Sequence, residues 1–376
     1  MTNRVVDLSE RPVRLSVRSS LLVIRDSSAG MGGSATPPVQ EEQRWDGKDA
    51  RTYRWERLHD AGELTIPLAD VAVLIASHPQ ISLTHAVLSG LAAAGGIFVA
   101  CDQKHMPASM LLPLAAHSLQ AERFARQAAA PLPLRKRLWQ EIVRAKIRAQ
   151  ARLLVERTGT DDGLCALVSQ VRSGDPANVE ARAARVYWVK LFGHTGFKRD
   201  PEGDGLNGRL NYGYAVLRAI TARALCGAGL HPGLGIHHHN RYDAFPLADD
   251  LMEPFRPAVD RAVANLHDAG RVRNPGLDTA AKRALLEPLL ARFNGNGESR
   301  TLFDWIAQTA SSLATAVESG DRKLDIPALE TSAEGAPRYG LWNGCDGVAG
   351  PTVGISHAPP QIFAVRISSH VVIRHV

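Results

Sequence analysis

Histidine and carboxylate side chains crowd together in GIHHHNRYDAFPLADDLMEP, residues 235–254. Three adjacent histidines are followed within sixteen residues by four acids: Asp243, Asp249, Asp250 and Glu253. If a helix begins near Ala248, Asp250 and Glu253 are three positions apart and project from the same face. His238 lies twelve residues before Asp250, in a polar stretch that can fold back over the start of that helix. The segment can therefore bring imidazole and carboxylate to one point.

A further carboxylate, Glu180, lies in PANVEARAARVYW, in the first turn of a predicted alanine-rich helix. Together, Glu180, His238, Asp250 and Glu253 offer mainly oxygen ligands and one imidazole. Such a set suits Mg²⁺ or Mn²⁺ better than metals that prefer thiolates, although it is also compatible with zinc. A purely structural alternative is that these acids cap helix starts or pair with neighbouring arginines.

Positive charge is concentrated in one segment. The formal net charge is +6, and residues 121–157 hold ten basic and three acidic residues, so the rest of the chain is about neutral. This concentration is typical of a protein that binds a polyanion, and the alternative is a solvated helix face. A hard divalent cation beside a basic surface indicates phosphate chemistry. The candidate DNA contacts are Arg135, Lys136, Arg137, Arg144, Lys146 and Arg148.

The order of the predicted elements indicates an α+β protein. Residues 13–106 read mainly as strands, with one helix over residues 79–95. GMGGSATPPVQEEQ interrupts this part, and residues 27–54 are expected to form a mobile loop. From about Leu111 the spacing is helical, with predicted helices over residues 133–157, 177–191, 210–227, 248–269, 279–293 and 300–318. No element is assigned to the tail, residues 336–376.

The apolar runs are too short or too broken by glycine for a membrane span, and the charged amino terminus is unlike a signal peptide. We therefore expect a cytoplasmic protein that does not enter a membrane.

Several ordered motifs resemble those of the CRISPR spacer-acquisition integrase, the core CRISPR-associated adaptation endonuclease, in its type II form. HPGLGIHHHNRYDAFPLADDLMEPFRP and RSGDPANVEARAARVYW carry the resemblance around the candidate acids. LNYGYAVLRA, IPLADVAVLI, CDQKHMPASMLLPL and LPLRKRLWQEIVRAKIRAQA carry it elsewhere. The resemblance runs from about Val13 to Asp268 and continues less distinctly to about Val317.

The resemblance implies a small amino-terminal β-sandwich domain, residues 1–107, followed by a larger all-α-helical catalytic domain, residues 108–335. It also implies a metal site formed by Glu180, His238, Asp250 and Glu253, of which Glu180, His238 and Glu253 are the catalytic residues. Only motif register selects His238 over His237 and His239.

The family inserts a short DNA duplex, the prespacer, into the CRISPR array by attack of its 3′-hydroxyl groups on phosphodiesters, with Mg²⁺ or Mn²⁺ as cofactor. The implied partners are double-stranded DNA of the prespacer and the CRISPR repeat, a second copy of the chain, and the smaller CRISPR-associated protein two. In type II systems the effector nuclease also helps to choose prespacers. The predicted sandwich would form the homodimer.

Two other functions remain open from the residues alone. A metal-dependent phosphohydrolase of small esters would explain the acids and the histidine but not the basic segment. A non-catalytic DNA-binding scaffold would explain the basic segment and leave the acids as helix caps. The residue 27–54 loop looks longer than the family's usual connection, and the tail matches nothing in the family.

Overall fold

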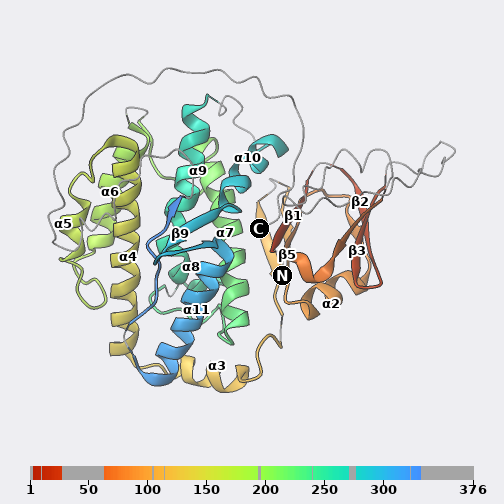
Figure 1. The fold of residues 1–376 in the computed structure, drawn as a ribbon, viewed down its shortest axis with the longest axis horizontal. Coiled ribbons are helices and arrows are strands. Elements are labelled where there is room, and N and C mark those ends of the chain that lie inside the picture. The colour runs from red at the N-terminus through yellow and green to blue at the C-terminus, as the bar shows by residue number, and fades with distance from the viewer. Residues whose placement is uncertain are drawn as a thin grey trace.

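The computed structural model describes residues 3–27 and 63–331, apart from residues 10, 104–105, 114, 194–195, 239, 271–276 and 322. Strands occur first and a mainly helical part follows (Figure 1). This order confirms the predicted α+β class. The predicted loop over residues 27–54, apart from Ser27, and the tail over residues 336–376 lie outside the described residues.

The amino-terminal part contains two four-stranded sheets. One has the order β1 (Arg4–Leu8), β5 (Val71–Ala76), β7 (Ile97–Cys101) and β8 (Pro107–Leu111), and the other has the order β4 (Glu63–Pro67), β3 (Leu21–Asp26), β2 (Val13–Arg18) and β6 (Ser82–Leu83). The 3₁₀ turn η2 (Leu68–Asp70) leads into β5, and α2 (His85–Ala93) precedes β7. One hydrophobic cluster joins residues of both sheets with α2, among them Val6, Leu15, Leu22, Leu74 and Leu91.

Two features of these sheets are finer than the sequence prediction. VRLSVRSSLLVIRD forms a hairpin, because Ser19 and Ser20 have φ angles of 49° and 62° and make a two-residue turn between β2 and β3. Strand β8 continues to Leu111, four residues beyond the predicted domain boundary. Serine pairs are weaker turn signals than Asn-Gly, so the sequence does not locate this turn.

The helical part is built around α7 (Leu206–Gly227). Before it come α3 (Gln120–Ala128), α4 (Leu132–Thr158), α5 (Leu164–Val168) and α6 (Val179–Leu191). After it come α8 (Pro246–Met252), η4 (Glu253–Phe255), α9 (Arg256–Asp268), α10 (Thr279–Leu289) and α11 (Leu302–Ser319). Helix α7 packs against α8, α9 and α11 and also contacts β5, β7 and β8. The sheet that contains β1, β5 and β7 contributes Val5, Val73 and Val99 to the core of the helical part. The two parts therefore share a hydrophobic interior.

The larger part is not all-helical, which corrects the sequence prediction. It carries a three-stranded sheet of order β10 (Glu298–Thr301), β9 (Arg292–Gly295) and β11 (Glu330–Thr331). Asn296 and Gly297, with φ angles of 48° and 82°, form the two-residue turn between β9 and β10. Helix α10 consequently ends at Leu289, before the predicted residue 293. The Asn-Gly pair was the signal in the sequence.

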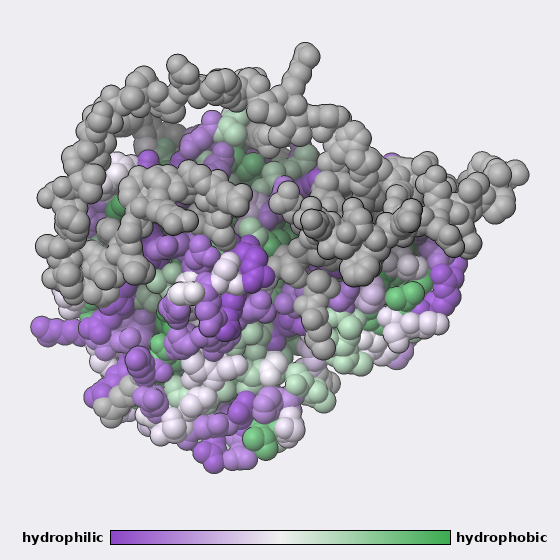
Figure 2. All heavy atoms as spheres, in the orientation of Figure 1, coloured by the Kyte–Doolittle hydropathy of each residue, from purple (hydrophilic) through white to green (hydrophobic). Residues whose placement is uncertain are grey.

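On the face shown in Figure 2, hydrophilic side chains predominate over the helical part. Within the described ranges, no helix is both long enough and apolar enough to cross a membrane.

Candidate acid–histidine site on the helical part

Asp250 organises residues 235–238, which we call the histidine loop. Its side chain is fully buried at the end of α8, and its two oxygens accept hydrogen bonds from the backbone N–H groups of Ile236, His237 and His238, at 2.6, 2.9 and 3.2 Å. The same carboxylate lies 2.6 Å from Nδ1 of His238. Because all of these donors surround it, Asp250 fixes the loop and the imidazole together. Because Nδ1 is engaged by Asp250, a ligand would bind His238 through its second nitrogen, Nε2.

The loop also depends on close backbone approach and on helix α4. A Cβ atom at Gly235 would lie 2.6 Å from the carbonyl oxygen of His238, so a larger residue cannot be accommodated without moving the loop. The buried ring of Trp139 stacks on His237, with centroids 4.2 Å apart, and meets His238 edge-on at 5.5 Å. Arg135 donates to the carbonyl of Ile236 at 3.3 Å. Helix α4 therefore supports the loop.

A second aspartate positions Glu180. Asp175 precedes α6, and its carboxylate accepts hydrogen bonds from the backbone N–H groups of Val179 and Glu180, at 3.0 and 2.9 Å. Gly174, Asp175 and Asn178 all have positive φ angles, so the chain turns sharply before the helix. These hydrogen bonds satisfy two free N–H groups at the start of α6 and so fix Glu180 in its first turn.

Lys146 joins Glu180 to Glu253. Its ammonium nitrogen lies 2.5 Å from Oε1 of Glu180 and 2.5 Å from Oε2 of Glu253. Oε1 of Glu253 accepts a hydrogen bond from Arg256 at 2.7 Å. These four residues, which we call the Lys146 cluster, come from α4, α6, η4 and α9. Two carboxylates and two cations are thus balanced in a largely buried setting.

The charges in this cluster reinforce one another. Burial by itself raises the pKa of Glu253, but the charges of Arg256 and Lys146 outweigh burial and lower that pKa to about 2. Burial lowers the pKa of Lys146, while Glu253 and Glu180 raise it further than burial lowers it. The hydrogen bond to Asp250 raises the pKa of His238. Burial lowers this pKa, and the charges of Asp250, Glu253 and Glu180 raise it, so the net change is upward. The imidazole therefore lies in the negative field of the same acids.

The donor set fits a divalent cation after local rearrangement. Oε2 of Glu253 is buried and, despite its contact with Lys146, accepts no hydrogen bond of ordinary geometry. Glu180 and Glu253 supply oxygen and His238 supplies Nε2, a set suited to Mg²⁺ or Mn²⁺. In the described part of the chain, no three His, Cys, Asp or Glu side chains already stand in a metal-binding arrangement. The ammonium of Lys146 lies between the two glutamates instead.

A second polar cluster adjoins the first. Asp260 on α9 is buried and accepts hydrogen bonds from the hydroxyl groups of Tyr187, at 2.7 Å, and Tyr214. We call these three residues the Asp260 cluster. The guanidinium of Arg256 lies over the ring of Tyr214, 4.0 Å from its centroid, and so links the two clusters. Burial raises the pKa of Asp260 to about 6, although the two tyrosines and Arg256 act to lower it.

The six candidate DNA contacts on α4 have different surroundings. Lys136 and Arg137 are exposed, whereas Arg135, Arg144 and Arg148 are half-buried. Arg144 donates to the carbonyl of Val171 at 3.0 Å. Lys146 is 8% exposed, because it faces the acids and not the surface. Its side chain is therefore part of the candidate site, which differs from the surface role expected from the sequence.

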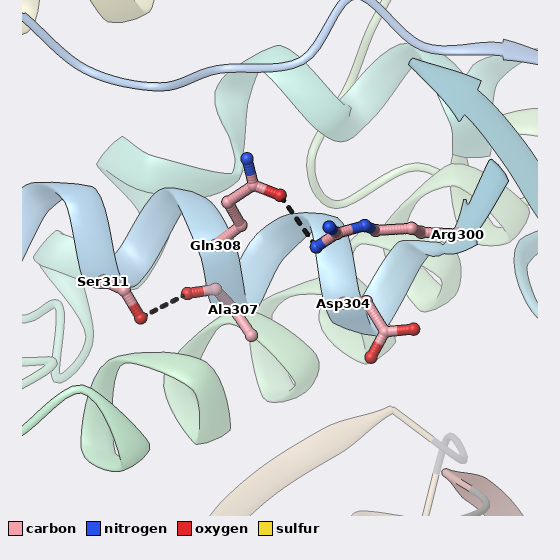
Figure 3. A pocket seen from close by; sticks show the side chains of 5 residues that line it. All are labelled: Arg300, Asp304, Ala307, Gln308 and Ser311. Carbon is pink, nitrogen blue, oxygen red and sulfur yellow. Dashed lines mark hydrogen bonds between the residues drawn. The ribbon is translucent and has the colours of Figure 1, made fainter. Parts of the chain in front are cut away.

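The remaining sequence candidates are also separated by the structure. Asp249 pairs with Arg218 of α7, at 2.5 Å between Oδ1 and Nε, whereas the neighbouring Asp250 holds the histidine loop. His237 stacks on Trp139, and His239 lies outside the described residues. A surface hollow on α11 is lined by Arg300, Asp304, Ala307, Gln308 and Ser311 (Figure 3). It includes none of the predicted site residues.

Comparisons with known proteins agree with this architecture. A solved casposase bound to its integration product has a TM-score of 0.67 at 20% identity, covering 86% of this chain and 92% of that one. A subunit of a Cas6-RT-Cas1–Cas2 complex has a TM-score of 0.62 at 18% identity, covering 85% of this chain and 35% of that one. The fold is therefore the one shared by these proteins.

Sequence similarity identifies the family. The family described as CRISPR associated protein Cas1 matches residues 40–292, more than half of the chain. The CRISPR-associated endonuclease Cas1 of Neisseria meningitidis serogroup C is 41% identical over 272 residues, which cover 70% of this chain and 87% of that protein. The chain belongs to the Cas1 family, as its motifs predicted.

Proposed function

We propose that this chain is a metal-dependent DNA endonuclease and integrase that inserts prespacer DNA into a CRISPR array. The observation that carries the proposal is that the ammonium of Lys146 contacts both Glu180 and Glu253. Beside them, the imidazole of His238 is held by a buried aspartate. The similar protein from Neisseria meningitidis is named an endonuclease, and the casposase structure contains an integration product. These names support the same class of chemistry.

In the proposed reaction, the 3′-hydroxyl oxygen of the prespacer forms a bond to a phosphorus atom of the array. The bond from that phosphorus to the neighbouring 3′-oxygen breaks, and this oxygen leaves with a proton, so one phosphodiester replaces another. Bound Mg²⁺ or Mn²⁺ would stabilise the charge that develops at phosphorus and lower the pKa of the attacking hydroxyl.

The residues of the chain have separate parts in this proposal. Glu180, Glu253 and Nε2 of His238 would hold the cation. Asp250 is assigned a positioning part, because its oxygens are already used by the histidine loop. This proposed part replaces the earlier expectation that Asp250 is itself a metal ligand. Arg256 keeps one oxygen of Glu253 engaged, which leaves Oε2 to face the cation.

The proposed partners follow from charge and from the related structures. Lys136 and Arg137, with Arg135, Arg144 and Arg148 on the same helix, would contact DNA phosphates, and each such contact should steepen the salt dependence of binding. One related structure is a complex that contains Cas2, so we propose the smaller CRISPR-associated protein two as a partner. We interpret the two amino-terminal sheets as the β-sandwich that forms a homodimer, and the type II effector nuclease as a further partner.

Strand transfer tests the proposal directly. Purified full chain, its small partner, a labelled duplex with free 3′-hydroxyl groups and a repeat-bearing supercoiled plasmid are mixed with Mn²⁺ or with EDTA. We expect covalent joining by wild type and by Glu287→Ala, a matched surface control on α10, and no joining with EDTA or by Glu180→Ala. DNA binding without joining under any metal favours the scaffold function. Hydrolysis of small phosphate esters without DNA favours the phosphohydrolase.

A further inference from the structure

Lys146 is placed unlike the other basic residues of α4. It pairs with two glutamates, one from α6 and one from η4, and its side chain is 10% exposed. Arg256, the other cation of the Lys146 cluster, also lies on the ring of Tyr214. Lys146 thus contacts two carboxylates, whereas Arg256 contacts one carboxylate and one aromatic ring.

The ammonium occupies the place that a cation between the two glutamates must take. Both Glu180 Oε1 and Glu253 Oε2 lie 2.5 Å from Nζ. Mg²⁺ binds carboxylate oxygens at about 2.0–2.1 Å, so an ion that bound this pair of oxygens would overlap with the nitrogen. The ammonium and the ion cannot contact the same two oxygens together.

Without Lys146, the charge of Arg256 alone would face two carboxylates, of which Glu253 is buried and Glu180 is half-buried. Glu253 is 4% exposed, and removing one partner of a buried ion pair leaves an uncompensated charge. The lysine removes this cost in the metal-free protein. Its flexible four-carbon stem allows the charge to withdraw without movement of the helix.

We propose that Lys146 is a built-in counter-cation of the metal site, which a divalent cation displaces when it binds. The inference rests on the proposed metal site. It makes the apparent metal affinity the outcome of a competition between the ion and the ammonium. In the metal-free protein, the ammonium thus compensates the carboxylates that the ion would otherwise compensate.

Calorimetric titration of the full chain with Mn²⁺ tests this competition. Lys146→Met removes the charge and retains the length of the side chain, and we expect it to bind Mn²⁺ about tenfold or more tightly than wild type. Lys146→Arg, which keeps the charge, should not bind more tightly. Lys190→Met is the matched control, because Lys190 forms a more exposed pair with Asp162 at 2.8 Å. Its Mn²⁺ affinity should equal that of wild type.

Thermal unfolding supplies a second readout. Lys146→Met should unfold at lower temperature than wild type in EDTA. Saturating Mn²⁺ should raise the unfolding temperature of this variant by more than it raises that of wild type. If this variant does not fold, Lys146→Gln replaces it, because the amide can still donate to one glutamate. Unchanged or weaker Mn²⁺ binding by the uncharged variants would overturn the inference. If Glu180→Ala bound Mn²⁺ as tightly as wild type, the proposed metal site itself would be overturned instead.

Discussion

The Lys146 cluster and the Asp260 cluster are neighbours that stabilise buried acids in opposite ways. Glu253 is matched by two formal positive charges, which lower its pKa to about 2. Asp260 is matched by two neutral phenol groups, and burial raises its pKa to about 6. Arg256 touches both clusters. Both acids are ionised at neutral pH, but Glu253 faces cations while Asp260 accepts hydrogen bonds from two hydroxyl groups, which suits the first to a cation site and the second to structural support.

The largest expected effect breaks the charge balance of the Lys146 cluster. In Glu253→Gln, one side-chain oxygen must serve both Lys146 and Arg256, and the amide NH₂ faces a cation. Because removing one partner of a buried ion pair leaves charge uncompensated, we expect the free energy of unfolding to fall by about 3–5 kcal/mol. Urea denaturation at pH 7 measures the change. A loss below about 1 kcal/mol would show that the pair behaves like a surface salt bridge.

A pH titration sharpens the contrast between the clusters. The folded pKa of Asp260, about 6, lies above its ordinary value of 3.8. The folded state therefore binds more protons between these values, and the stabilisation present below pH 4 is lost as pH rises through 6. The loss is about 3 kcal/mol at most. Glu253 acts in the other direction, because its lowered pKa stabilises the folded state above 4.5 and this is lost as pH falls towards 2.

The Asp260 contribution is isolated by subtraction. Stability is measured by urea denaturation of wild type and Asp260→Asn at pH 4, 5 and 6.5, and the difference between the two proteins is compared across pH. The amide introduced by this substitution does not titrate, so the difference in favour of wild type should shrink as pH rises. A difference that grows with pH would mean that the pKa of Asp260 is lowered in the folded protein.

The sequence predicted the main elements and four candidate site residues, but not the contacts that these residues make. Helical spacing located the major helices, and the family motifs selected Glu180, His238, Asp250 and Glu253. The buried place of Lys146 was also readable, since Trp139, Val143, Lys146 and Gln150 recur at helical spacing and form one buried stripe of α4. The lysine was counted with its basic neighbours, because charge was summed without regard to helix face.

Other features depend on contacts that spacing cannot supply. The pairing of Tyr187 and Tyr214 with Asp260 joins residues 73 and 46 positions apart. The left-handed turn at Asp175 and Asn178 is set by its tertiary surroundings and by the capping carboxylate. Local propensity carries no information about the tyrosine pairing, whereas Gly, Asp, Pro and Asn in GDPAN do favour a turn before α6. The Asn-Gly hairpin at residues 296–297, by contrast, was a local signal that the helical prediction overrode.

The smallest expected effect separates two adjacent aspartates, Asp249 and Asp250, which the sequence could not rank. Successive helix positions point about 100° apart, so one carboxylate meets the histidine loop and the other meets Arg218. Asp249→Asn weakens a partly exposed ion pair with Arg218 and should cost about 1 kcal/mol or less, with Mn²⁺ affinity unchanged. Asp250→Asn is the matched comparison, because its amide NH₂ would face backbone N–H donors and release His238. Equal Mn²⁺ affinities in the two variants would contradict the positioning role of Asp250, whereas weaker binding only in Asp250→Asn would place the histidine loop within the metal site.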